Sequence, residues 1–313
     1  MIHETRIDLP VTIRGEQPFL HCRLAGPVGA PLLLFLHGFP EGPFIWDEVI
    51  THFATNHRCV APALRGYPGS HTPTEVKAYR AHEVVADLLA LIRLQAPTPD
   101  TPAAAVIGHD WGGAIAWTLA SMAPTALARL MILNAPHTAT FLRDLRDDPA
   151  QQAASAYMND LRAPEAEAVL SANDFAALWA LVQRFGAAHG LSDQAREAWR
   201  AQLRAQWSGH PLTGALNYYR ASPLYPPTQA DDPVRRLALP DAAVHVGVPT
   251  TVLWGEADEE KRIAGWKAVD RFIADNALVI PLLQYVQPIL HAPGVTVTPH
   301  ASGALLPHLM KRA

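Results

Sequence analysis

The feature that most constrains this chain is an apolar run that ends in an aspartate flanked by glycines. Residues 104–113 read AAVIGHDWGG, and the small and apolar residues AIAWTLA follow. A strand that passes directly into a helix needs a sharp turn, and glycines two positions on either side of the central residue leave room for close packing. The pattern predicts a strand, a strained turn and a helix, with Asp110 held at the tip.

Asp110 allows two interpretations, a helix cap or a nucleophile. Aspartate is a common N-cap residue, but a cap does not account for the paired Gly108 and Gly112. A carboxylate with a reference pKa of about 3.9 is ionised at neutral pH and can attack carbon without a base to activate it. Attack on a saturated carbon would displace an epoxide oxygen or a halide and leave an ester for water to cleave. We therefore expect chemistry different from that of serine esterases and lipases.

Further apolar runs indicate the other strands of the fold. They are rich in leucine or β-branched residues and span residues 32–36, 59–63, 130–133 and 250–253. Such continuous runs are typical of a parallel sheet covered on both faces. Helical patterns at residues 81–95 and 113–122 lie between them, and residues 6–13 and 19–24 are expected to add an antiparallel edge pair. The order of elements predicts an α/β fold.

Local composition divides the chain into a core and an insertion. From about residue 141 to residue 221 the chain is rich in Ala, Gln, Arg, Glu and Trp at helical spacing, and proline-dense residues follow. We expect residues 1–138 and 233–313 to form the core, the latter with an irregular C-terminus. Residues 139–232 are expected to form a helical lid.

Composition and charge exclude several classes of function. Hydrophobic residues make up 49% of the chain, and its formal net charge of -4 offers no basic surface for nucleic acid. The first residues, MIHETRIDLP, lack the pattern of a secretory signal, so we expect a cytoplasmic protein without membrane association. Cys22 and Cys59 are too few for a disulfide framework, and no ligand cluster indicates a metal or an organic cofactor. The oligomeric state stays open.

A second loop is placed to stabilise negative charge beside the nucleophile. HGFPE, at residues 37–41, follows the apolar run PLLLFL. With a nucleophile on a strand-to-helix turn, this location supplies one oxyanion donor and the residue after the nucleophile supplies the other. The predicted donors are the backbone N–H groups of Phe39 and Trp111, each typically worth ~3 to 4 kcal/mol. The alternative is an ordinary strand-ending turn. We expect His37, which precedes the turn, to be structural.

These motifs resemble the epoxide hydrolase branch of the α/β-hydrolases. The resemblance implies a mostly parallel central sheet flanked by helices, with an inserted helical lid. Haloalkane and haloacetate dehalogenases share the Asp nucleophile, so the core motifs do not separate the two activities. The segments that carry the resemblance are HGFPE at 37–41, ALRGYPGS at 63–70, GHDWGG at 108–113, LNAPH at 133–137 and WGEAD at 254–258.

Two lid tyrosines favour epoxide opening. In the family that the chain resembles, their hydroxyls hydrogen-bond the epoxide oxygen and help it to leave as an alcohol, which a departing halide does not require. ALNYYRA, at residues 215–221, matches Tyr219 to one of them, and SAYMNDLRAP matches Tyr157 to the other, with Pro164 at the family's proline. The alternative for each is an aromatic side chain packed on an amphipathic helix.

The resemblance also implies an acid that orients the catalytic base. VLWGEAD, at residues 252–258, ends in the loop where this fold places the acid, which indicates Asp258. Asn134 occupies a second possible location and could only orient a neighbour. His109, inside the nucleophile turn, is expected to be a packing and hydrogen-bonding neighbour.

The catalytic histidine departs from the family pattern. If His291 corresponds to the family's second C-terminal histidine, then Gln287 occupies the catalytic position. Glutamine cannot act as a base. We therefore assign the base to His291, with His300 and His308 as alternatives.

These expectations define three candidate functions. The first is an epoxide hydrolase that converts a small apolar epoxide and water into a vicinal diol through an ester on Asp110. The second is a dehalogenase in which the indole N–H of Trp111 binds the halide. The third, suggested by the irregular C-terminus, is a catalytically impaired binding protein. An apolar substrate is favoured by the aromatic lid residues Phe175, Trp179, Trp199 and Trp207.

Overall fold

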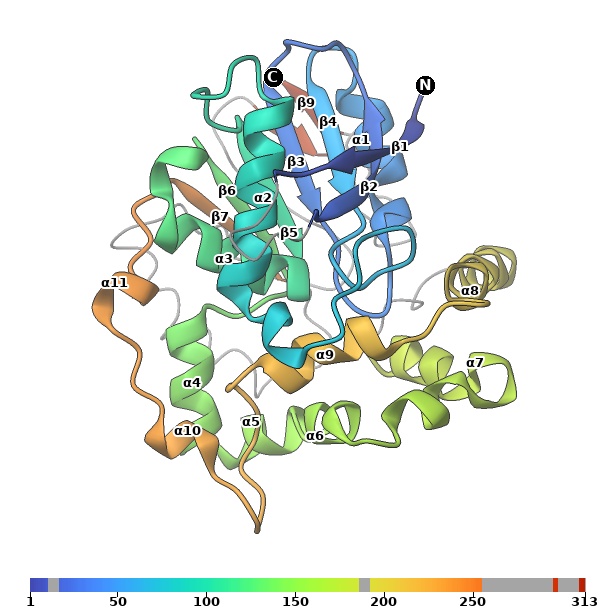
Figure 1. Cartoon of the computed structure of the whole chain (residues 1–313), viewed down its shortest axis with the longest axis vertical. Helices are drawn as coiled ribbons and strands as arrows, with labels where there is room; N and C mark the ends of the chain where they lie inside the picture. The colour runs from blue at the N-terminus through green and yellow to red at the C-terminus, as the bar shows by residue number, and fades with distance from the viewer. Residues whose placement is uncertain (11–16, 186–191, 255–294, 298–309, 313) are drawn as a thin grey trace.

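A seven-stranded sheet forms the centre of the molecule (Figure 1). The computed structural model describes residues 1–10, 17–185, 192–254, 295–297 and 310–312. The strand order is β1-β2-β4-β3-β5-β6-β7. The strands are β1 (His3–Asp8), β2 (Phe19–Ala25), β3 (Leu32–Leu36), β4 (Arg58–Pro62), β5 (Ala105–His109), β6 (Leu130–Leu133) and β7 (Thr250–Leu253), and a separate antiparallel pair is formed by β8 (Val295–Val297) and β9 (Met310–Arg312).

The sheet is parallel from β4 to β7 and antiparallel at its β1 edge. This confirms the predicted α/β architecture, and the bounds of β3, β6 and β7 are those that the apolar runs predicted. The first strand begins at His3, earlier than the predicted residue 6, because it pairs along β2 from His3 opposite Leu24. Its exposed side chains carry no hydrophobic signal for that start.

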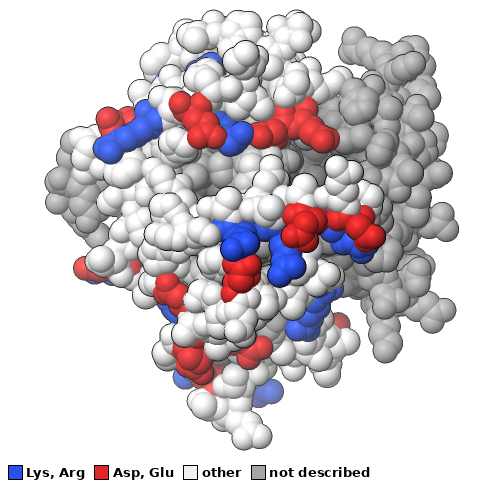
Figure 2. All heavy atoms as spheres, turned by 90° about the vertical axis from the view of Figure 1, so that its right-hand side faces the viewer, with Lys and Arg blue, Asp and Glu red and all other residues white. Residues whose placement is uncertain are grey.

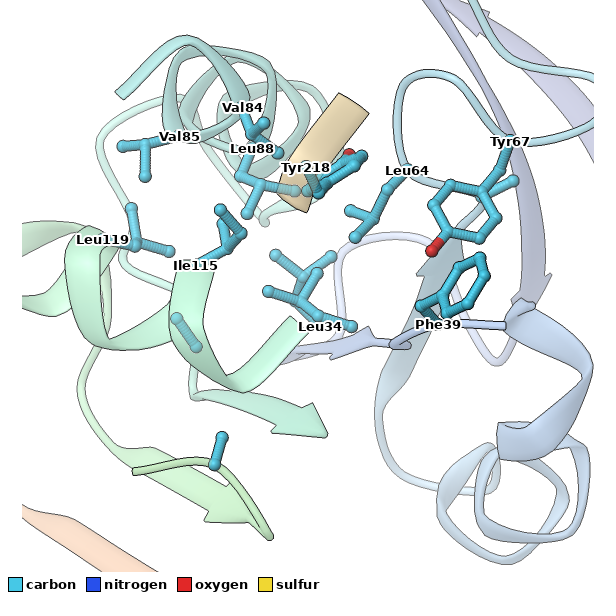
Figure 3. Packing of buried hydrophobic residues seen from close by; sticks show 14 of the residues in the cluster. Leu34, Phe39, Leu64, Tyr67, Val84, Val85, Leu88, Ile115, Leu119 and Tyr218 are labelled. Carbon is cyan, nitrogen blue, oxygen red and sulfur yellow. The ribbon is translucent and has the colours of Figure 1, made fainter. Parts of the chain in front are cut away.

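Helices cover both faces of the sheet, and alternate residues of β3 point to opposite faces. Leu34 packs toward α2 (Ala81–Gln95) and α3 (Trp111–Met122), and Figure 3 shows it beside Leu88 and Ile115 of these helices. Phe35 packs on the other face with Ile50 of α1 (Asp47–Phe53). Short 3-10 helices complete the core at Pro43–Trp46 (η1), Val76–Tyr79 (η2) and Pro124–Ala126 (η3).

Between β6 and β7, the described part of the chain is helical. In Figure 1, α6, α7 and α9 lie beyond the edge where β3 and β5 end, and α7 is interrupted at residues 172–175, three of which have positive φ. The helices are α4 (Thr138–Asp147), α5 (Pro149–Ala154), α6 (Tyr157–Arg162), α7 (Ala166–Arg184), α8 (Asp193–Trp207), α9 (Thr213–Ala221), α10 (Pro233–Arg236) and α11 (Asp241–Val244).

Side chains of α8 and α9, which fall in the segment predicted to form a lid, bind backbone carbonyls of loops at the sheet. The indole Nε1 of Trp207 donates to Pro40 O at 2.8 Å, and the hydroxyl of Tyr218 donates to Arg65 O at 3.0 Å. The α9 backbone also approaches closely, because a Cβ added at Gly214 would lie 2.4 Å from Gly66 O. Helices α8 and α9 therefore contact the two loops that follow β3 and β4.

Charged side chains of both signs lie next to one another on the face shown in Figure 2. Ion pairs in the described part of the chain include Arg23 with Asp47 and Arg204 with Asp174, each at 2.7 Å. In the described ranges, no helix is both long and apolar enough to cross a bilayer.

Candidate active site

Asp110 occupies the sharp turn between β5 and α3. Its backbone has φ 51° and ψ -121°, a region that residues other than glycine rarely adopt. The flanking glycines make this turn possible, since a Cβ on Gly108 would lie 2.5 Å from Gly112 O, and one on Gly112 would lie 2.3 Å from Leu36 O. The side chain of Asp110 makes no capping hydrogen bond to α3, so a helix cap does not explain it.

Backbone N–H groups of Phe39 and Trp111 act on the Asp110 carboxylate. The N–H of Phe39 donates to Oδ1 at 2.8 Å, and the N–H of the adjacent Trp111 also lowers the pKa of the carboxyl. The structure thus brings together the two donors that the sequence assigned to an oxyanion site. Gly38 makes the approach possible, because a Cβ there would lie 2.3 Å from Asp110 Oδ1.

His37 holds the loop after β3 and does not face the carboxylate. Its Nε2 accepts a hydrogen bond from the Leu64 N–H at 3.1 Å, so its Nδ1 carries the proton and donates to Gly38 O at 3.0 Å. Burial lowers the pKa of His37 to about 4, so the ring is neutral at physiological pH. This arrangement agrees with the structural role expected for His37.

A second carboxylate lies beside the nucleophile. Glu41 is only 5% exposed, and its Oε2 is 3.6 Å from Nδ1 of His109. Burial raises the pKa of Glu41, His109 opposes the increase, and Asp110 adds to it. Burial likewise raises the pKa of Asp110, against the effects of His109 and the two backbone N–H groups. The imidazole therefore interacts with both acids.

Sequence reasoning missed this pairing of Glu41 and His109, although a signal was present. Each residue follows or ends a buried run, and the two runs, β3 and β5, are neighbouring parallel strands. The carboxyl ends of neighbouring parallel strands meet at one edge of a sheet. However, the sequence does not show that β3 and β5 are neighbours, because that depends on the order of the strands in the sheet.

Tyr219 lies directly over the nucleophile turn. It is 3% exposed, and its ring packs edge-on against Trp111, 5.1 Å away, and Phe39, 5.6 Å away. Burial raises the pKa of Tyr219 well above its usual value, Asp110 and Tyr157 raise it further, and the adjacent Trp111 side chain opposes this. Tyr219 is therefore a protonated phenol within electrostatic reach of the Asp110 carboxylate.

Tyr157, at the start of α6, approaches the same carboxylate. Burial raises the pKa of this phenol, Asp110 adds to the increase, and Arg184 opposes it. Its ring also packs against Phe185, with the ring centroids 4.7 Å apart. Tyr218, by contrast, turns its hydroxyl to the core carbonyl of Arg65. Of the two adjacent tyrosines of α9, the structure places Tyr219 at the site.

The remaining predicted site residues fall outside the described part of the chain. They are Asp258, Gln287, His291, His300 and His308. Asn134 is described, with φ 49°, and its N–H donates to Leu253 O at 3.0 Å, at the end of β7. Within the ranges that the structure covers, no group of three or more His, Cys, Asp or Glu side chains is arranged to hold a metal ion.

The fold and the Asp110 turn define a class of protein. The family model described as alpha/beta hydrolase fold matches residues 31–280. The chain belongs to this family.

Individual proteins to which the chain is similar give a more specific comparison. The chain is 31% identical to mouse epoxide hydrolase 4 over 79% of its own length, and it covers 65% of that protein. It is 33% identical to the AB hydrolase superfamily protein YfhM of Bacillus subtilis, with 76% of this chain and 78% of that protein aligned. The structure is similar to that of the Bacillus megaterium epoxide hydrolase in complex with an inhibitor, with a TM-score of 0.73, 27% identity, and 90% and 93% of the two chains covered.

Proposed function

We propose that this protein is an epoxide hydrolase that works through an ester on Asp110. The observation that supports the proposal is the Asp110 carboxylate at the β5–α3 turn, hydrogen-bonded by the Phe39 N–H, with the phenols of Tyr219 and Tyr157 within electrostatic reach. The named relatives, mouse epoxide hydrolase 4 and the Bacillus megaterium enzyme, support the substrate class. The chain spans 65% of the mouse protein, and the activity is assigned on the site itself.

In the first step, an ionised oxygen of Asp110 attacks an oxirane carbon and the ring C–O bond breaks. The oxygen that leaves gains negative charge and takes a proton from a lid phenol. Because the pKa values of Tyr219 and Tyr157 are raised, both phenols stay protonated at neutral pH and can donate. The product of this step is a hydroxyalkyl ester on the enzyme.

In the second step, water adds to the carbonyl carbon of that ester and the ester C–O bond to the diol breaks. One proton of the water goes to the departing diol oxygen and the other restores the phenol, which regenerates the Asp110 carboxylate. Negative charge develops on the Asp110 oxygen that the N–H groups of Phe39 and Trp111 address. Such donors typically contribute ~3 to 4 kcal/mol each. The base for the attacking water is assigned from the sequence to His291, oriented by Asp258.

The dehalogenase alternative assigned the indole N–H of Trp111 to a halide. In the structure, the ring of Trp111 packs edge-on against the ring of Tyr219, with the ring centroids 5.1 Å apart. A departing halide does not require a phenol as proton donor, so the position of Tyr219 beside Trp111 favours the epoxide assignment. Release of halide from a chloroalkane or bromoalkane would instead support the alternative.

Intact-mass spectrometry during reaction with styrene oxide tests the proposal. The parent protein should produce diol and show an adduct of one substrate mass, and Asp110→Asn should show neither, because an amide lacks the nucleophilic charge. His291→Gln should form the adduct and retain it, since only the second step needs a base. An adduct on Asp110→Asn at the parental rate would exclude Asp110 as the nucleophile.

A further inference from the structure

The two helices that carry the lid tyrosines exchange arginine contacts at their C-terminal ends. Tyr157 is the first residue of α6, and Arg162 is its last. Tyr219 lies in the last turn of α9, followed by Arg220. Figure 1 shows α6 and α9 side by side. Each arginine reaches the backbone of the other helix.

Arg162 binds a carbonyl that α9 cannot satisfy by itself. The carbonyl of Tyr219 would accept from the N–H of the residue four positions later, but that residue is Pro223, which has no N–H. Nη1 of Arg162 donates to Tyr219 O and, at 3.0 Å, to Ser222 O. The guanidinium therefore replaces the missing donor on the backbone of the tyrosine itself.

Arg220 makes the reciprocal contact at the end of α6. Its Nη2 donates to Ala163 O at 3.1 Å, and its Nε donates to Arg162 O at 3.4 Å. A cation at the C-terminus of a helix is also favoured by the helix dipole. Two cations thus hold the ends of α6 and α9 in one relative position.

Aromatic stacking fixes the guanidinium of Arg162 further. It lies over the ring of Tyr225, 3.5 Å from the ring centroid. The hydroxyl of Tyr225 donates to Asp231 at 2.7 Å, which orients the ring. The planar guanidinium of Arg162 binds two carbonyls and also stacks on an aromatic ring. The ammonium of lysine would lose some of these contacts.

We propose that Arg162 and Arg220 are positioning residues that set the relation of the Tyr157 and Tyr219 hydroxyls to the substrate oxygen. The inference rests on the proposed function, because it assigns the two arginines to epoxide opening. Catalytic groups displaced by 1 Å can lose roughly 100-fold in rate. Arg162 binds the turn that carries Tyr219, and Arg220 binds the end of the helix that carries Tyr157.

The test is the single-turnover rate of ester formation with styrene oxide in Arg162→Met and Arg220→Met. Each variant should form the ester about 10 to 100 times more slowly than the parent, with substrate binding changed by about threefold or less. Arg162→Lys should fall between Arg162→Met and the parent. Arg204→Met removes an exposed lid ion pair with Asp174 and is the matched control, which should keep the parental rate.

A purely structural role would give a different pattern. In a Tyr219→Phe background, the effect of Arg162→Met should shrink to about threefold or less, because no Tyr219 hydroxyl remains to be positioned. An undiminished effect there would overturn the inference, and so would a parental rate in both methionine variants. If Arg162→Met does not fold, Arg220→Met and Arg162→Lys carry the same comparison. A parent that forms no ester with epoxides overturns the proposed function and this inference together.

Discussion

Two sides of the candidate site are held by different kinds of contact: the Asp110 turn and its neighbouring loops, called the core side, and helices α6 and α9 of the predicted lid, called the lid side. On the core side, Asp110 is placed by its own backbone conformation and by the backbone N–H of Phe39 in the loop after β3. On the lid side, Tyr219 is placed by a helix whose end is bound by Arg162, 57 residues away in the chain. The comparison teaches that the nucleophile depends on backbone geometry and close packing, whereas the phenols depend on side chains that join separate helices.

The largest expected effect comes from disturbing the core side. Gly38→Ala would place a Cβ 2.3 Å from Asp110 Oδ1 and 2.4 Å from its Cβ, so the carboxylate must move off the Phe39 N–H. We expect the single-turnover rate of ester formation to fall roughly 1,000-fold. Gly247→Ala is the control, because its Cβ would meet nothing closer than a His245 atom at 3.9 Å.

If Gly38→Ala keeps the parental rate while Gly247→Ala does the same, the approach of the β3 loop to Asp110 is not required for chemistry. The position of the nucleophile would then not depend on close backbone packing, which would contradict the difference drawn between the two sides. Circular dichroism and a thermal unfolding scan show whether both variants are folded.

Tyr219→Phe tests the lid side with a smaller change. Ester formation should slow by about 100-fold while the affinity for substrate changes little, because the hydroxyl bond strengthens as charge builds on the epoxide oxygen. Tyr218→Phe is the matched control, because it removes the same hydroxyl group from the neighbouring residue. It loses only the hydrogen bond to Arg65 O, so it should cost about 1 kcal/mol of unfolding free energy and leave the rate near the parental value.

Equal rate losses in the two phenylalanine variants would contradict the assignment of Tyr219 over its neighbour. A normal rate in Tyr219→Phe together with a slow Tyr157→Phe would move the proton donor to Tyr157. Pre-steady-state measurement of the ester distinguishes these cases, since it separates the first step from hydrolysis.

The smallest expected effect is on stability, and it has opposite signs on the two sides. Because burial raises the pKa of Asp110, the folded protein binds that proton more tightly than the unfolded chain does. Stability is therefore lost as pH rises from the unfolded pKa through the raised folded pKa. Asp110→Asn should be more stable than the parent by about 1 kcal/mol near neutral pH, and the difference should narrow at acid pH.

Asp231, on the lid side, provides the opposite case. A hydrogen bond from Tyr225 lowers the pKa of this exposed carboxyl, so its contribution to stability is present at neutral pH and lost as pH falls. Asp231→Asn should not stabilise the protein at neutral pH. Urea unfolding at several pH values measures the free energy of unfolding of both Asn variants. If Asp110→Asn is less stable than the parent near neutral pH, burial of the Asp110 carboxylate does not destabilise the fold.

The strands and the nucleophile turn could be predicted from the sequence because they depend on neighbouring residues. Continuous apolar runs marked β3, β6 and β7 with the bounds that they have in the structure. The spacing of Gly108, Asp110 and Gly112 indicated a strained turn, since few residue patterns permit a positive φ at a residue other than glycine. The start of β1 was wrong because an exposed edge strand is set by its partner.

The tertiary structure alone decided which side chains meet. It placed Glu41 beside His109 because β3 and β5 are neighbours in the sheet, although they are separated by β4 and α2 in the chain. It also directed Tyr219 to Asp110 and Tyr218 to the core, and it brought Arg162 to the carbonyl that Pro223 leaves without a partner. Such contacts depend on how distant segments pack, and backbone propensity acts only over a few adjacent residues.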